Sequence, residues 1–137
     1  MTNKSKQVLQ PQGWAPAKGY ANGVAVTGRQ IFVAGQIGWN AHGQFESDDL
    51  VDQIRQALQN IKAVLHEGGA QPRHIVRMTW YLLDKREYVM RGREIGMAYR
   101  EVLGREFEIA MSAVQVAGLI EDRAQVEIEV TAVVEGD

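Results

Sequence analysis

The sequence predicts an α+β protein in which two helices cover one face of a mixed β-sheet. Three observations lead to this class. Two stretches repeat apolar residues at the 3.6-residue period of a helix, and several others alternate at the two-residue period of a strand. The elements follow one another as strand, strand, helix, strand, helix, strand, strand, which is typical of a two-layer fold. The face without helices is then either solvated or buried against another subunit.

The length of the chain is that of one domain. Its 137 residues, 45% of them hydrophobic, are enough for one core and too few for two ordinary ones. Neither a repeat nor a low-complexity linker divides the chain. We therefore expect a single domain over residues 1–137, with residues 1–18 as an N-terminal extension, part of it loosely ordered.

The first half of the chain contains the elements with the clearest boundaries. Residues 23–37 predict a hairpin, because two β-rich runs flank Gly28, which can adopt a positive φ. Residues 47–69 predict a helix that Ser47 caps and that ends at Gly68-Gly69. Its apolar stripe consists of Leu50, Ile54, Leu58, Ile61 and Leu65.

The second half adds three strands and a helix. A strand is predicted over residues 75–83, with Val76, Met78, Trp80 and Leu82 on one face. A helix over residues 86–103 is weakened by its glycines and ends at Gly104. Strands near residues 108–117 and 125–134 complete the chain.

The last strand has an apolar face and a mixed face. Val126, Ile128 and alternate residues after them share one side, and the opposite side carries Glu127, Glu129, Thr131 and Val133. We expect the mixed side to lie away from the helices. There the apolar side chains of Met111, Ala113 and Val133 would be more stable against another subunit than in water.

Composition limits the partners and the compartment. Fifteen Lys and Arg against 17 Asp and Glu leave a formal charge of −2, without the basic footprint of a protein that binds nucleic acid or an anionic membrane. The longest uncharged run, residues 109–120, is shorter than the roughly 18 to 20 apolar residues of a membrane helix. Without cysteine or an apolar leader, the chain reads as a soluble, cytoplasmic protein.

Several motifs in fixed order carry a family resemblance. They are Gly19-Tyr20, 34-AGQIGWN-40, 50-LVDQIRQALQNIKAVLHEGG-69, 75-IVRMTWYLLD-84, 110-AMSAVQVAGL-119 and 126-VEIEV-130. With them the chain resembles the RidA/YjgF family from Gly19 onward. The resemblance implies a chorismate-mutase-like fold with a mixed six-stranded sheet, a homotrimer, and small-molecule clefts between neighbouring subunits. It also implies hydrolysis of reactive enamines and imines, with release of ammonia and without metal or organic cofactor.

The resemblance also implies the site residues. Hydrolysis of an imine needs a positioned water and a group that moves its protons, which a partly desolvated carboxylate can do. Glu127 stands at the family's carboxylate position, whereas we expect Glu129 to be a solvated strand residue. The predicted substrate-binding residues are Tyr20, Gly35, Trp39, Met111 and Ser112.

Met111 marks the main departure from the family pattern. An arginine stands there in the family and binds the substrate's carboxylate, a bond that contributes roughly 1.5 to 3 kcal/mol. Here the stretch reads Ala110-Met111-Ser112, and Ala34 and Gly96 depart from a family serine or threonine and an asparagine. We therefore expect altered substrate recognition, unless Arg91 or Arg93 replaces the anchor.

Two classes of function remain open. One is a deaminase-like hydrolase, and the other is a non-catalytic trimer that binds a small molecule. The acidic balance disfavours a ribonuclease or translation inhibitor. The three histidines lack metal-ligand spacing, and Ser112 lacks the G-x-S-x-G setting of a nucleophile, so we expect neither a metal site nor a serine hydrolase.

Overall fold

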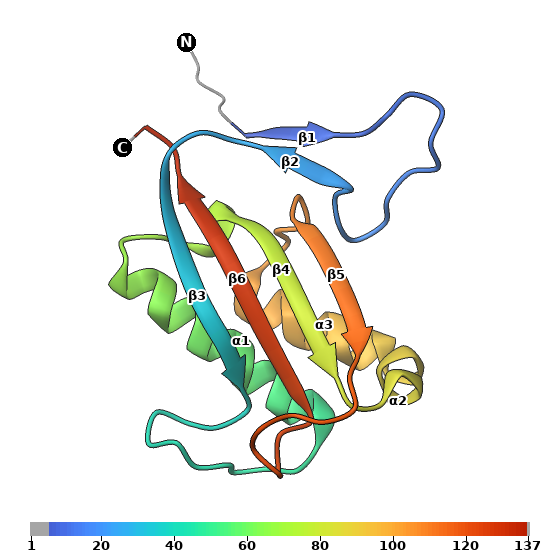
Figure 1. Ribbon diagram of the computed structural model, residues 1–137, viewed down its shortest axis with the longest axis vertical. Coiled ribbons are helices and arrows are strands. Elements are labelled where there is room, and N and C mark those ends of the chain that lie inside the picture. Colours follow the sequence, from blue (N-terminus) through green and yellow to red (C-terminus); the bar gives the residue numbers. More distant parts are fainter. Residues whose placement is uncertain (1–5, 137) are drawn as a thin grey trace.

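A four-stranded sheet forms the centre of the molecule (Figure 1). The computed structural model describes residues 6–136. The sheet has the order β3-β6-β4-β5, formed by β3 (Arg29–Ile37), β6 (Val126–Val134), β4 (Ile75–Leu82) and β5 (Ala110–Gln115). β6 pairs antiparallel with β3 and with β4, and β5 pairs parallel with β4. The last strand of the chain therefore lies inside the sheet and is hydrogen-bonded on both sides.

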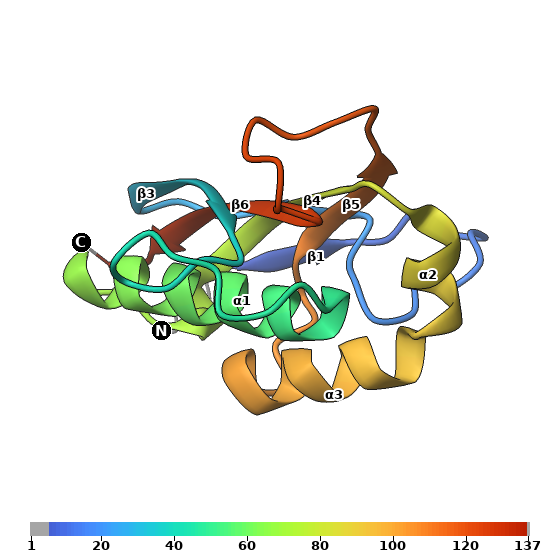
Figure 2. The same cartoon turned by 90° about the horizontal axis from the view of Figure 1, so that it is seen from below.

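Helices cover one face of this sheet, as the sequence predicted. Figure 2 shows α1 (Leu50–Glu67) and α3 (Gly92–Leu103) together under the sheet, whereas the connection from β5 to β6 rises on the opposite side. The short α2 (Lys85–Met90) leads into α3, and η1 (Pro72–His74) leads into β4. None of the helices within residues 6–136 combines the length and the apolar character needed to cross a membrane.

The predicted hairpin over residues 23–37 is wrong. β2 (Gly23–Ala25) pairs with β1 (Gln7–Leu9) in a separate two-stranded sheet, and β3 pairs with β6. The six strands within residues 6–136 are thus divided between a two-stranded and a four-stranded sheet, instead of forming the expected six-stranded one. Gly28 still provides the turn with φ of +157°, where a Cβ would lie 2.3 Å from the carbonyl oxygen of Val134. The extension before Gly19 contains β1, which the sequence pattern did not predict.

The helix boundaries differ from the prediction in two places. Asp49 is the N-cap of α1 instead of Ser47, and its carboxylate accepts from the backbone N–H of Asp52. The predicted helix over residues 86–103 is divided at Arg91 into α2 and α3. Gly92 follows this break, where the low helix propensity of glycine makes an interruption inexpensive.

A buried amide joins α1 to the loop before β6. Gln53 is 1% exposed and donates to the carbonyls of Ser47 and Arg123, while its side-chain oxygen accepts from the backbone N–H of Gln125. Gly38 leaves room for this side chain, since a Cβ there would lie 2.5 Å from the Cβ of Gln53. The amide therefore satisfies three backbone groups that would otherwise be buried without partners.

Replacing this amide is expected to destabilise the fold. Gln53→Leu keeps the volume but removes all three hydrogen bonds, so the free energy of unfolding should fall by about 2 to 4 kcal/mol. Denaturant unfolding measures the change. The control Gln59→Leu alters an exposed glutamine of the same helix and should stay within about 0.5 kcal/mol. Equal stability of the two variants would contradict the role of Gln53.

A buried histidine makes stability depend on pH. Nδ1 of His74 accepts from the backbone N–H of Gln71 at 2.9 Å, which requires that nitrogen to be unprotonated. Burial, followed by the nearby charge of Arg73, lowers the pKa of His74 below its ordinary 6.5. Between the two pKa values the unfolded chain binds more protons than the folded protein, so stability falls as the pH falls.

The pH dependence of unfolding tests this histidine. Denaturant midpoints of the wild type should decrease between about pH 7.5 and about pH 5.5, the interval in which an unfolded histidine takes up its proton. His74→Gln should flatten this decrease, whereas His66→Gln, at an exposed position of α1, should retain it. A wild-type midpoint that is constant over this interval would contradict the assignment.

Candidate functional site

The face opposite the helices carries the predicted catalytic carboxylate. In β6 the side chains of Val126, Ile128 and Val130 are buried on the helix side, so Glu127 and Glu129 lie on the other face. Glu127 is half-buried and Glu129 is exposed. The predicted alternation of β6 is therefore confirmed.

Gly35 makes room for the carboxylate of Glu127. The pairing of β3 with β6 shifts register between Val33 and Gln36, which places two residues of β3 opposite one residue of β6. A Cβ built on Gly35 would lie 2.0 Å from Oε2 of Glu127, far inside van der Waals contact. Two residues predicted for the site are thus in direct contact, and Gly35 determines where the carboxylate can lie.

Tyr81 is a neighbour of this carboxylate that the sequence did not single out. β4 pairs with β6 so that Tyr81 lies opposite Glu127 and Thr79 lies opposite Glu129. Partial burial, together with the negative charges of Glu129 and Glu127, raises the pKa of Tyr81. The phenol stays protonated at neutral pH and can donate a hydrogen bond beside the carboxylates. The alternation of β4 places Tyr81 on the face opposite Trp80 and Leu82, but only the strand order shows that Glu127 lies beside it.

A second group of predicted residues lies at the β5 edge of the sheet. Tyr20, Met111 and Ser112 line a hollow of about 280 Å³ with Trp80 and Tyr88. The backbone holds Tyr20 there, because the N–H of Ala21 donates to the carbonyl of Ile109 at 2.9 Å. Three of the residues predicted for substrate binding therefore lie together at this edge of the chain.

The face predicted for Met111 is wrong. β5 runs parallel to β4 with Met111 opposite Met78 and Ala113 opposite Trp80, and both partners are core residues on the helix side. Met111 packs against the core, whereas Val133 alternates with Glu127 on the opposite side of the sheet. The three residues do not share a face, because β5 is uncharged and its pattern does not reveal which side is buried. Ser112, opposite Thr79, lies on the open face.

A further cavity of about 380 Å³ adjoins this edge. It shares Gly19, Trp80, Tyr88 and Met111 with the first hollow and extends under α2 and α3. The other lining residues are Val89, Gly92, Ile95, Gly96, Tyr99, Arg100 and Phe107. Of all the residues that line this cavity, Gly96 and Met111 were the two that the sequence marked as departures from the family pattern. The cavity is therefore mainly apolar, with one guanidinium on its wall.

Trp39 stands apart from both groups. Its ring packs against Phe45 with centroids 6.0 Å apart, and its carbonyl accepts from the side-chain amide of Asn60. It lines neither of the two cavities at the β5 edge. Within one chain, the ring contributes to the loop after β3.

Arg91 is engaged in ion pairs between the helices. Its guanidinium lies 2.8 Å from Asp49, 3.1 Å from Glu87 and 2.8 Å from Glu94. These carboxylates raise the pKa of Arg91, and its guanidinium lowers the pKa of Asp49 and of Glu94. A guanidinium that is shared by three carboxylates is not free to bind a substrate's carboxylate in place of the missing arginine.

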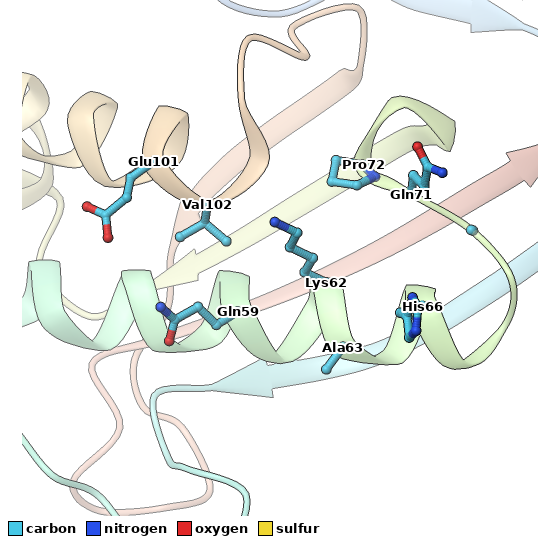
Figure 3. A pocket seen from close by; sticks show the side chains of 9 residues that line it. Gln59, Lys62, Ala63, His66, Gln71, Pro72, Glu101 and Val102 are labelled. Atoms are coloured by element: carbon cyan, nitrogen blue, oxygen red, sulfur yellow. The ribbon is translucent and has the colours of Figure 1, made fainter.

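A hollow of about 480 Å³ on the helix layer lies away from all predicted site residues. Figure 3 shows Gln59 and Lys62 of α1, Val102 and Glu101 of α3, and Pro72 around it. No predicted residue lines it. Within residues 6–136 there is also no group of three His, Cys, Asp or Glu side chains placed to hold a metal ion. Apart from Trp39, the residues predicted for the site lie beside Glu127 or at the β5 edge, away from this hollow.

Comparison with known proteins gives one family. The model of the Endoribonuclease L-PSP family matches residues 11–134. A RutC family protein of Pyrococcus abyssi is 34% identical over 118 residues, which cover 85% of this chain and 87% of the relative. The human 2-iminobutanoate/2-iminopropanoate deaminase is 30% identical over 115 residues, 83% of this chain and 79% of that protein.

Solved structures agree with this result. YyfB, a Rid family protein of Yersinia pestis, superposes with a TM-score of 0.80 at 30% identity, over 96% of this chain and all of the other. TdcF of E. coli, solved with bound serine, gives a TM-score of 0.68 at 28% identity, over 94% of this chain and 99% of TdcF. The chain belongs to the Endoribonuclease L-PSP family, which confirms the RidA/YjgF membership that its motifs predicted.

Proposed function

We propose that the protein is a cofactor-free hydrolase of a reactive enamine or imine, acting in clefts between the subunits of a homotrimer. The observation that carries this proposal is the carboxylate of Glu127, which Gly35 accommodates on the open face of the sheet. The named activity of the human relative supports the reaction class. The expected assay is ammonia release from a panel of freshly generated imines and enamines.

The separation of the two groups of site residues supports a composite cleft. β4 lies between β6, which carries Glu127, and β5, which carries Ser112, so two strand spacings of about 4.8 Å separate them. Met111 lies on the opposite side of the sheet. One subunit therefore does not bring Glu127 to the β5 edge. The open face of one subunit packed against the β5 edge of its neighbour would do so.

The chemistry assigned to Glu127 is proton transfer. Its carboxylate takes a proton from water as the water oxygen bonds to the C=N carbon and the π electrons move to nitrogen. Delivery of the proton to nitrogen gives a carbinolamine. As its C–N bond breaks, the hydroxyl proton passes to the leaving nitrogen, and a carbonyl compound and ammonia are released. The phenol of Tyr81, opposite Glu127, can donate a hydrogen bond to the carboxylate or to the water.

A second function is favoured by Met111. Without the arginine of the family pattern, the cleft lacks its carboxylate anchor at this position, and a trimer that binds a small molecule without turnover would tolerate that loss. Melting temperatures measured with the same panel of compounds separate the two functions. Thermal stabilisation without ammonia release would favour binding, and ammonia release would favour catalysis.

The role of Glu127 is tested by an isosteric change. Glu127→Gln keeps the shape of the side chain but cannot accept the proton, so activity on the best substrate should fall by about a hundredfold or more. Light scattering should show an unchanged assembly. Activity within about threefold of the wild type would make Glu127 a structural residue.

The contact with Gly35 gives an independent test that leaves Glu127 in place. Gly35→Ala introduces a methyl group 2.0 Å from the present position of Oε2, so the carboxylate must move. A displacement of this kind should reduce kcat by about tenfold or more. Gly118→Ala, at a glycine whose Cβ would meet open space, is the control and should retain activity. Full activity of Gly35→Ala would separate Glu127 from the chemistry.

The identity of residue 111 should decide the handling of small imino acids. Wild-type turnover of 2-iminopropanoate should be poor, because a thioether leaves the substrate's carboxylate unpaired in a partly dry cleft. Met111→Arg should raise kcat/KM for 2-iminopropanoate and 2-iminobutanoate by about ten- to a hundredfold, and Met111→Leu should not. The arginine should also lower Tm without ligand. A wild-type kcat/KM of about 10⁴ M⁻¹s⁻¹ or above would contradict this account.

A further inference from the structure

The apolar cavity behind Met111 and the guanidinium on its wall together define a ligand class. We propose that the cavity receives an aromatic-sized apolar group of the ligand and that Arg100 binds a carboxylate carried by that group. This inference rests on the proposed function in so far as the same cleft would hold the reacting imine. In this proposal the carboxylate of the ligand lies beside Arg100 instead of beside residue 111.

The size and walls of the cavity fit an apolar group. Its volume of about 380 Å³ is within the usual range for small-molecule pockets, roughly 300 to 1,000 Å³. Trp80, Tyr88, Tyr99 and Phe107 supply aromatic walls, and Tyr99 and Phe107 stack with centroids 5.4 Å apart. The side chain of Met111 closes the end that it shares with the hollow of Tyr20 and Ser112.

The glycines at residues 92 and 96 leave this space open. A Cβ on Gly92 would meet no atom within 4 Å, although the residue lines the cavity from the first turn of α3. An asparagine in place of Gly96 would need room that the guanidinium of Arg100 occupies, since a Cβ there would lie 3.2 Å from Nη1. The two departures at Gly96 and Met111 thus affect one cavity: they remove two polar side chains and admit Arg100.

Trp80 contributes an unused hydrogen-bond donor. The residue is 3% exposed and lines both hollows, and its Nε1 has no partner among the residues that the structure describes. A buried N–H without an acceptor is unfavourable by about 1 to 3 kcal/mol. The N–H itself is covered in this structure, but the indole forms part of the cavity wall, so a ligand in the cavity changes its surroundings and the indole reports occupancy.

Arg100 is the cation on the wall of this cavity. Among the residues that the structure describes, no carboxylate forms an ion pair with it. Arg91, in contrast, is held by three carboxylates. A guanidinium binds a carboxylate through two parallel hydrogen bonds, so it selects an acid over the corresponding amide. The ligand class is therefore a monocarboxylate with an apolar spacer, and a small acid such as propanoate lacks the group that fills the cavity.

Three probes that contain no C=N bond separate these contributions: 3-phenylpropanoate, 3-phenylpropanamide and propanoate. Titration calorimetry on the full chain should give 3-phenylpropanoate at least about tenfold tighter binding than either of the others. The Trp80 indole signal in ¹H–¹⁵N spectra, assigned with Trp80→Phe, should shift with 3-phenylpropanoate. Equal affinities for the three probes, or an indole signal that does not move, would overturn the proposal.

Variants of α3 test whether Arg100 binds the carboxylate of the probe. Arg100→Gln should weaken binding of 3-phenylpropanoate by about tenfold and leave 3-phenylpropanamide unchanged. Arg93→Gln removes a charge from the same helix outside the cavity and should change neither. An unaltered affinity in Arg100→Gln would overturn the assignment of the anchor. Because none of the probes contains a C=N bond, their binding is measured apart from imine turnover. Probe binding without ammonia release from the imine and enamine panel would sink the proposed hydrolase alone, and ammonia release from that panel without probe binding would sink this inference alone.

Discussion

The position of β6 between β3 and β4 is the constraint on which the rest of the site depends. A strand that is hydrogen-bonded on both sides cannot rotate, so its alternate residues are assigned to opposite faces. The burial of Val126, Ile128 and Val130 against the helices forces Glu127 and Glu129 onto the open face. The same pairing sets Tyr81 beside Glu127, and the irregular pairing of β3 brings Gly35 under its carboxylate. A hydrophobic layer on one side of the sheet thus positions a polar group on the other.

The β5 edge has the opposite character. Met111 lies on the helix side of the sheet. There it lines an apolar cavity together with Gly92 and Gly96 of α3. In the family pattern an arginine and an asparagine stand at positions 111 and 96, and both would bring polar atoms to this region. Under the proposed function, their replacement by methionine and glycine would change what the edge can bind. The pairing of β4 with β6 positions Glu127 independently of both residues.

The sequence predicted the periodic features of this fold and missed those that depend on pairing. The period of α1 and the alternation of β6 are local, so the helix and the face of Glu127 were predicted correctly, as were the core positions Met78, Trp80 and Leu82 of β4. Val76 was wrong, because an irregular pairing at the start of β4 buries Ile75 in its place. The hairpin at residues 23–37 failed because β3 pairs with a strand about a hundred residues away, a choice that local propensity does not encode. The face of Met111 was predicted wrongly because β5 is uncharged, so its sequence shows no clear alternation of polar and apolar residues. Tyr81 and Arg100 gain their significance only from neighbours in space.

A cleft shared between subunits is the central claim, and subunit mixing tests it most directly. One inactive variant carries Glu127→Gln in β6, and the other carries Ser112→Phe, which puts a large side chain on the open face at the β5 edge. In trimers reassembled from equal amounts, about one quarter of the clefts should combine an intact edge with an intact carboxylate from the neighbouring subunit. If the cleft is shared between subunits, ammonia release should return to about a quarter of the wild-type rate. Mixed trimers that remain as inactive as the parent variants would contradict it.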